Sequence, residues 1–259
     1  MAGIDTNQPK LTRGQVTFVP ACNPRAYKAG ARCVDRNLNR YLAPMESPDC
    51  YEAQIGNVLC PLLEGCDVLL DLHSYTAGGA SFVFIDNQDN REEYAFAASL
   101  GVDVIMSGWT QTCVAMGQGS AKKDNESAGT TEYARRFGAI AVTLECGQHK
   151  EPNSVEIAYR ALRNALRHCG LVTKNPDEAT AAATPRHIVM THVYYQDDGG
   201  VFTKAWRNFE KVAAGEIIAI RGNGEKLRAS KDSVIIMPKA TAVLGEEWFY
   251  FGVERPTLA

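Results

Sequence analysis

Short apolar runs that end abruptly in polar residues recur along the chain. Residues 68–70 lead into His73, and residues 139–144 lead into Glu145. A short continuous apolar run is typical of a strand that is covered on both faces. Ligands of open α/β sheets bind at the carboxyl ends of such strands. The pattern therefore predicts two buried strands whose tips carry His73 and Glu145.

Other segments have the spacing of helices or of further strands. Apolar residues at helical spacing predict a helix that follows a Ser47 cap, a second near residues 90–101 and an amphipathic one over residues 154–170. Runs rich in β-branched and aromatic residues predict strands over residues 15–20 and 81–86. Strands that alternate with helices favour an α/β domain.

A change of composition divides the chain. Residues 173–185 are polar and rich in Ala, Thr and Pro, which is typical of a linker. Beyond them, short β-rich runs are separated by turns, and Gly222-Asn223-Gly224 predicts a hairpin. The sequence therefore predicts an α/β domain over residues 1–172 and a small all-β domain over residues 186–259.

Composition and charge narrow the class of protein. With 45% apolar and 22% charged residues and a net charge of −3, nothing indicates nucleic acid or an acidic membrane as a partner. No run of apolar residues is long enough for a transmembrane helix, and the first residues lack the pattern of a signal peptide. The eight cysteines form no CxxC pair, so we expect reduced thiols and a cytoplasmic location.

The loop that follows the first predicted strand is rich in groups that bind anions. Arg32, Asn39 and Arg40 lie within the segment "RCVDRNLNR". A guanidinium grips a carboxylate through two parallel hydrogen bonds, and an Asn amide both donates and accepts. The loop favours a small anionic substrate, although a solvated basic loop would have the same composition. His73 and Glu145 also have ordinary alternatives, because strand ends often carry a hydrogen-bonded His or a helix-capping Glu.

Four motifs, taken together, resemble those of one known family. "NPRAYKAGARCVDRNLNR", "DLHS", "TLECG" and the closing "GEEWFYFG" occur in the order and spacing of the succinylglutamate desuccinylase/aspartoacylase family, a branch of the zinc carboxypeptidase superfamily. The resemblance extends from about Gly14 to the end of the chain. It implies a mixed sheet flanked by helices and followed by a small β domain.

The resemblance also implies roles for individual residues. His73 matches a zinc ligand, and Glu145 matches the carboxylate that activates the zinc-bound water. The implied reaction is hydrolysis of the amide bond of an N-acyl amino acid or a similar small anion. Arg40 matches a residue that binds the substrate and also polarises the scissile carbonyl. The residues matched to substrate binding are Arg32, Asn39, Arg40, Arg135 and Tyr250.

One part of the family pattern is missing. The other two zinc ligands of the family come from an HxxE motif, and none of the five histidines here starts one. His149, four residues after Glu145, is the nearest candidate substitute, and an exposed loop His is the simpler interpretation. We therefore expect zinc, one ion per complete protein, to bind weakly or not at all.

The favoured hypothesis is an enzyme that lacks its first segment. The alternatives are a family member that has lost catalysis and a non-catalytic binding protein for an acidic metabolite. Oligomerisation stays open.

Overall fold

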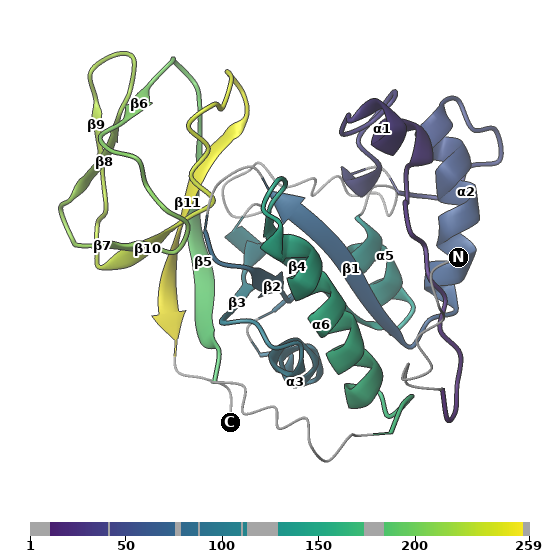
Figure 1. Cartoon of the computed structure of the whole chain (residues 1–259). Coiled ribbons are helices and arrows are strands. Elements are labelled where there is room, and N and C mark those ends of the chain that lie inside the picture. The colour runs from purple at the N-terminus through teal and green to yellow at the C-terminus, as the bar shows by residue number, and fades with distance from the viewer. Residues whose placement is uncertain are drawn as a thin grey trace.

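One mixed sheet of eight strands runs through the molecule (Figure 1). The computed structural model describes residues 11–40, 42–75, 79–87, 89–109, 111–112, 129–173 and 184–255. In order across the sheet, the strands are β1 Val68–Tyr75, β4 Ile140–Gln148, β2 Phe82–Phe84, β3 Val104–Ser107, β5 Arg186–Tyr195, β11 Glu247–Arg255, β10 Ser233–Ile236 and β7 Lys211–Val212. β1 and β4 are parallel, whereas β2 runs antiparallel to β4. The predicted α/β fold with a mixed sheet is confirmed.

Helices cover both faces of the first half of this sheet. On one face, α3 (Arg91–Ser99) and α6 (Asn153–His168) share a core with the sheet. On the other face, α2 (Tyr51–Glu64) and α5 (Thr130–Arg136) share a second core with it. β4 contributes to both cores because its successive side chains point to opposite faces of the sheet. Val142 packs with α3 and α6, whereas Ala141 packs with α2 and α5. The predicted amphipathic helix is α6, which ends at His168 with Cys169 as its C-cap; Gly170, whose φ is 64°, follows.

The C-terminal part is built from strands, as predicted, but its long strands continue the same sheet. β5 pairs with β3 in parallel and with β11 in antiparallel register. A second sheet holds β6 (Val201–Phe202), β8 (Ile217–Ile220) and β9 (Lys226–Arg228). β8 and β9 form the predicted hairpin, in which Gly224 N–H donates to the Arg221 carbonyl at 2.9 Å. Most of the predicted linker, residues 174–183, lies outside the described residues.

Two local predictions are wrong. Residues 15–20 form no strand, and Phe18 in their middle is 65% exposed. A strand needs a neighbour to accept its backbone hydrogen bonds, and within the described part of the chain no strand pairs with this segment. α2 begins at Tyr51 after Cys50 instead of following a Ser47 cap. The segment before it contains two short helices, α1 (Pro24–Ala29) and η1 (Leu38–Arg40).

Two further observations concern the length of the helices and the state of the cysteines. Of the helices that the structure describes, none has the length and apolar character needed to cross a bilayer. The seven cysteines in the described ranges are all free thiols.

Candidate active site

His73 and Glu145 face each other at the tips of two parallel strands. β1 and β4 pair so that His73 lies opposite Glu145 in the register. Both side chains project toward the face of α2 and α5, because they share the parity of Leu69 and Ala141 along their strands. The Nδ1 atom of His73 lies 3.9 Å from Oε1 of Glu145. The sheet therefore brings together the two residues that the apolar pattern singled out.

The environment of these two residues shifts their proton affinities. Burial alone lowers the pKa of His73, but its hydrogen bond to Asp71 and the charges of Asp71 and Glu145 outweigh burial, so the pKa is raised. Burial raises the pKa of Glu145, and the charge of Asp71 acts in the same direction, against the charges of His73 and Arg32. Oε2 of Glu145 is buried and has no hydrogen-bond partner within the described part of the chain. A carboxylate with a raised pKa is a better general base near neutral pH.

The predicted anion-binding loop is held in place by a buried carboxylate that the sequence did not single out. Glu52 is 2% exposed. Its Oε1 accepts from Asn23 Nδ2 at 2.8 Å and from Val34 N at 2.6 Å. Its Oε2 accepts from the backbone N–H groups of Asp35 and Arg36 at 3.1 and 3.3 Å. Glu52 therefore shapes the backbone of the loop that carries Arg32, Asn39 and Arg40.

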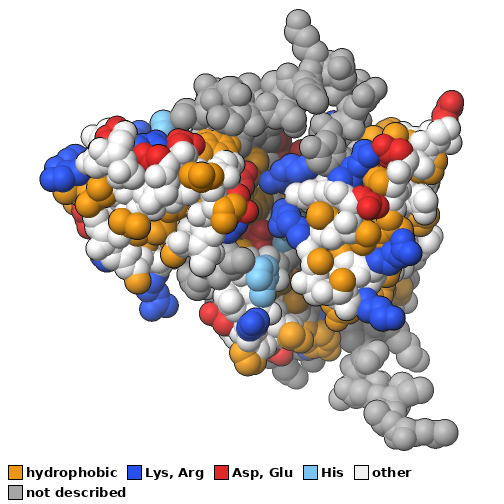
Figure 2. All heavy atoms as spheres, turned by 90° about the horizontal axis from the view of Figure 1, so that it is seen from above, with side chains coloured by type: hydrophobic (Ala, Val, Ile, Leu, Met, Phe, Trp, Pro, Cys, Tyr) orange, Lys and Arg blue, Asp and Glu red, His pale blue; other side chains and the backbone are white. Residues whose placement is uncertain are grey.

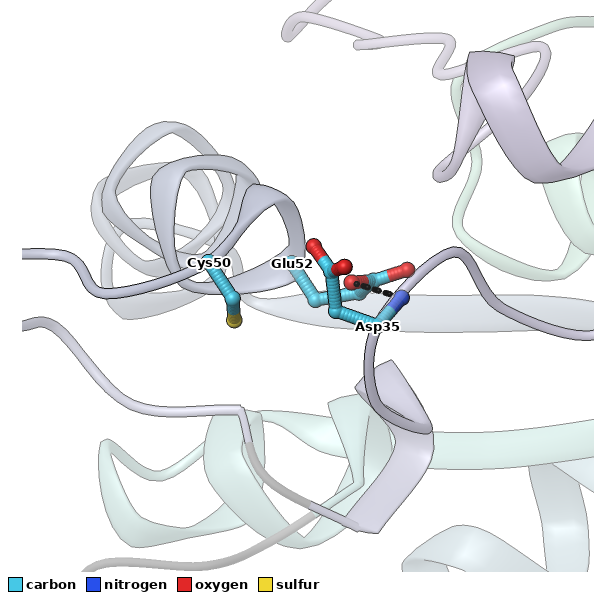
Figure 3. Close-up of side chains that lie close together, drawn as sticks. All are labelled: Asp35, Cys50 and Glu52. Carbon is cyan, nitrogen blue, oxygen red and sulfur yellow. Dashed lines mark hydrogen bonds between the residues drawn. The ribbon is translucent and has the colours of Figure 1, made fainter.

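Glu52, Asp35 and Cys50 lie close enough together to suggest a metal site (Figure 3). The hydrogen bonds indicate another role. Four N–H donors point at the oxygens of Glu52, and Tyr51 N–H donates to Asp35 Oδ2 at 2.9 Å. N–H groups present positive charge to these oxygens, which opposes a cation there. We therefore interpret the cluster as the anchor of the loop and of the first turn of α2.

The loop places its three candidate residues differently. Arg32 is exposed, and its charge acts on the pKa values of His73, Glu145 and His149, so it lies within electrostatic reach of the strand tips. Asn39 is half-buried beside Gly129, the residue that precedes α5. Arg40 is exposed, and its Nη1 donates to the Asn39 carbonyl at 2.9 Å. The structure thus gathers Arg32 with His73 and Glu145, and leaves the Arg40 side chain at the surface.

Arg135 lies in a different setting. Its Nε donates to Oε1 of Glu93 at 2.5 Å, and its Nη2 donates to the Ala141 carbonyl at 2.5 Å. Glu93 is 1% exposed. The guanidinium is therefore bound by Glu93 of α3 and by the Ala141 carbonyl of β4, and among the described residues no hydrogen bond or ion pair joins it to His73.

Tyr250 is a core residue of β11. It is 3% exposed, and its ring lies 4.9 Å from the Trp109 ring, centroid to centroid. It shares this apolar cluster with Tyr75, the last residue of β1. The phenol of Tyr75 donates to the Ala80 carbonyl at 2.8 Å, and the Tyr75 hydroxyl oxygen accepts from Asn208 Nδ2 at 3.5 Å. Packing thus connects the C-terminal strands with the tip of β1.

Seen from above, the molecule has a hollow between two lobes (Figure 2). Lys and Arg side chains gather along one side of the hollow, and acidic and His side chains appear within it. A basic rim attracts small anions into such a hollow.

Asp71 and Thr130 are site residues that sequence reasoning missed. Asp71 Oδ2 lies 2.9 Å from His73 Nε2, and Thr130 Oγ1 donates to the same Asp71 oxygen. The D-x-H spacing was a usable signal for Asp71, because residues two apart on a strand share a face. Thr130 comes from α5, 59 positions away in the sequence, and no local pattern indicates it.

Comparisons with known proteins agree with this fold. Residues 4–169 match the model of the succinylglutamate desuccinylase/aspartoacylase catalytic domain. The chain belongs to the succinylglutamate desuccinylase/aspartoacylase family. A curated relative, described as a probable aspartoacylase of Prochlorococcus marinus subsp. pastoris, is 34% identical over 84 residues, which are 30% of this chain and 28% of that protein. This chain therefore matches less than a third of that relative's length.

Solved structures share the fold at low identity. The succinylglutamate desuccinylase/aspartoacylase from Rhodobacter sphaeroides superposes with a TM-score of 0.72 at 17% identity, over 92% of this chain and 74% of that one. The product-bound ectoine utilization protein EutE (DoeB) from Ruegeria pomeroyi gives a TM-score of 0.67 at 21% identity, over 91% and 74%. Succinylglutamate desuccinylase from Vibrio parahaemolyticus gives 0.64 at 18%, over 90% and 70%.

The donor set around His73 does not amount to a zinc site by itself. A catalytic zinc takes three protein ligands and a water. At the strand tips, the described residues offer the imidazole of His73, with Nε2 bound to Asp71. The next imidazole, that of His149, is exposed, and its Nδ1 is hydrogen-bonded to Ser74 Oγ at 2.8 Å. The only cluster of three possible ligands in the described ranges is the loop anchor at Glu52.

Proposed function

We propose that the site around His73 and Glu145 hydrolyses the amide bond of an N-acyl amino acid or a similar small anion. The observation that carries the proposal is the pair His73 and Glu145, in register at the tips of parallel strands, with Nδ1 3.9 Å from Oε1. Membership of the desuccinylase/aspartoacylase family and the charge of Arg32, which lies within electrostatic reach of this pair, support it. We propose zinc as the metal of the complete site, with His73 as one ligand, and the cytoplasm as the location.

The chain's own side chains account for the proton and charge movements of this reaction. Glu145 takes a proton from the attacking water and passes it to the departing amine, as the new C–O bond forms and the C–N bond breaks. Arg40 turns toward the substrate and donates to the carbonyl oxygen, where negative charge builds; one such donor is worth about 3 kcal/mol. Arg32 and Asn39 hold the substrate's carboxylate through charge-assisted hydrogen bonds.

A second candidate is a binding protein for an acidic metabolite. The incomplete donor set around His73 favours it, because the loop needs no metal to hold a carboxylate. The two candidates share the anion-binding loop and differ in hydrolysis.

Zinc analysis tests the donor set at the strand tips. We expect the chain 1–259, dialysed after zinc loading, to retain far less than one zinc per chain, because a catalytic zinc takes three protein ligands and His73 is the only residue at the described strand tips that matches a zinc ligand of the family. Elemental analysis measures this, with the variant His73→Ala as the baseline. Stoichiometric zinc in the wild type would contradict the prediction, and His149→Ala would then identify the additional ligand.

Ligand binding tests the loop. Calorimetric titration with N-acetylaspartate and N-succinylglutamate should detect binding, and Arg32→Ala or Arg40→Ala should each weaken it about ten- to a hundredfold, the loss of a charge-assisted hydrogen bond. Arg36→Ala is the matched control, since Arg36 in the same loop pairs with Asp49 at 2.5 Å. If circular dichroism shows folded wild type but neither ligand binds at millimolar concentration, the loop is not an anion site.

A further inference from the structure

A histidine is buried where the helix-covered strands of the main sheet meet the C-terminal strands. His187 lies on β5, opposite Ile105 of β3 in parallel register, and β3 and β5 are neighbours at this junction. His187 is 2% exposed. Its ring lies 5.4 Å from the ring of Tyr94 on α3, centroid to centroid. The imidazole therefore packs between the β3–β5 pair and α3.

Within the described part of the chain, only one ring nitrogen of His187 has a hydrogen-bond partner. Nε2 lies 2.9 Å from Oγ of Ser107, which is 0% exposed. Nδ1 is buried and has no partner among the described residues. A neutral ring carries one N–H donor and one lone pair, whereas a protonated ring carries two N–H donors. Protonation would therefore bury an N–H group without an acceptor, which is unfavourable.

The charges near His187 also act on its protonation. On β11, Arg255 lies opposite His187 in antiparallel register, so the two side chains project from the same face of the sheet. Burial lowers the pKa of His187, and the charge of Arg255 lowers it further. The charge of Asp89, in the turn before α3, acts in the opposite direction. From β3 and α3 the neighbours are the Ser107 hydroxyl and the ring of Tyr94, and neither supplies an anion.

We propose that the Ser107–His187 pair is an acid-sensitive latch, which holds α3 on β3 and β5 while His187 is neutral and loosens this contact when His187 takes up a proton. Opening exposes the ring to water, which accepts hydrogen bonds from both N–H groups. Folding lowers the pKa of His187 below its ordinary value of 6.5. The latch therefore contributes its full stability above about pH 6.5 and loses it as the pH falls through the lower pKa of the folded state. It does not depend on the proposed function.

Hydrogen exchange of the full chain 1–259 tests the latch, followed by mass spectrometry from about pH 7.5 to about pH 5 and corrected for the intrinsic exchange rate. Peptides that cover α3 and β3 should lose protection as the pH falls. Because opening takes up one proton, the opening equilibrium should grow by up to about tenfold per pH unit between pH 6.5 and the lower pKa of the folded state.

The variant His187→Phe keeps a ring and cannot be protonated, so it should remove this pH dependence. The double variant Ser107→Ala, His187→Phe takes its place if the single variant does not fold, since it also removes the hydroxyl that would be left unpaired. His168→Gln is the matched control, because the exposed His168 contacts the same helix, with its ring 5.5 Å from that of Phe96. It should leave the pH dependence of α3 unchanged.

Two results would overturn the proposal. One is a wild type whose α3 and β3 peptides are equally protected across this pH range. The other is a folded His187→Phe variant, single or double, that loses protection with falling pH as the wild type does. If His168→Gln abolished the pH dependence instead, the sensitive group would be His168.

Discussion

Replacing Glu52 with alanine should lower the free energy of unfolding by about 4 kcal/mol, because it removes a buried carboxylate and leaves its four N–H donors without that acceptor. The side chain is 2% exposed and accepts from Asn23, Val34, Asp35 and Arg36. Three of these donors are backbone groups of the anion-binding loop, so the variant should also lose affinity for N-acyl amino acids. Urea unfolding measures the first effect and calorimetry the second.

The same carboxylate should make stability depend on pH. Burial raises the pKa of Glu52, but the hydrogen bonds from Val34, Asn23, Asp35 and Arg36 outweigh burial and lower the pKa from 4.5 to about 2. A carboxyl whose pKa is depressed by folding stabilises the fold above its unfolded pKa. This contribution is complete above about pH 4.5 and is lost as the pH falls toward about 2. Glu52→Gln should remove this part of the acid dependence.

The exposed Glu46 is the matched control for Glu52, since Glu46→Ala makes the same change of charge nearby. It should change stability by less than about 0.5 kcal/mol. If Glu52→Ala is as stable as Glu46→Ala, the loop does not depend on the buried carboxylate, and a metal at the Asp35, Cys50 and Glu52 cluster would have to be reconsidered.

Replacing Arg135 with alanine should cost about 3–5 kcal/mol of stability, because it leaves the carboxylate of Glu93 buried without its cation. Arg135 contacts Glu93 through Nε at 2.5 Å and Nη2 at 3.3 Å. Affinity for N-acyl amino acids should stay within about twofold in the folded protein. A residue that held substrate would show the opposite pattern, with a large loss of affinity and little loss of stability.

Arg136→Ala is the control for Arg135, because Arg136 is the exposed neighbour on the same helix, with its guanidinium 5.9 Å from the Tyr133 ring. Its stability should stay close to that of the wild type. The double variant Glu93→Met, Arg135→Met should recover much of the lost stability, because apolar side chains of similar volume can replace a buried ion pair. A stable Arg135→Ala that binds substrate tenfold more weakly would return Arg135 to the substrate site.

Predictions from local patterns were confirmed where neighbouring residues alone decide the structure. β1 and β4 were visible as apolar runs, and the positions of His73 and Glu145 at their tips followed from the turn residues behind them. The hairpin at Gly222-Asn223-Gly224 was visible for a similar reason, because short turns are governed by the residues within them.

Other features of the structure depend on a partner that is distant in the sequence. Residues 15–20 have the composition of a strand, but a strand exists only beside another strand. Arg135 lies ten positions before Glu145, and the sequence did not reveal that Glu93, 42 positions earlier, neutralises its charge. For the same reason Glu52 was not recognised as the anchor of a loop up to 29 positions away.

By itself, the sequence determined the class of the fold, the strands that carry His73 and Glu145, and the concentration of Arg and Asn side chains over residues 32–40. These properties depend on hydrophobic periodicity and side-chain chemistry, which are local. Only the tertiary structure decided that His73 faces Glu145, that Asp71 and Thr130 anchor the imidazole, and that Arg135 belongs to a buried ion pair. Those outcomes depend on strand register and on helix packing, and both are set by the burial of apolar side chains from segments far apart in the chain.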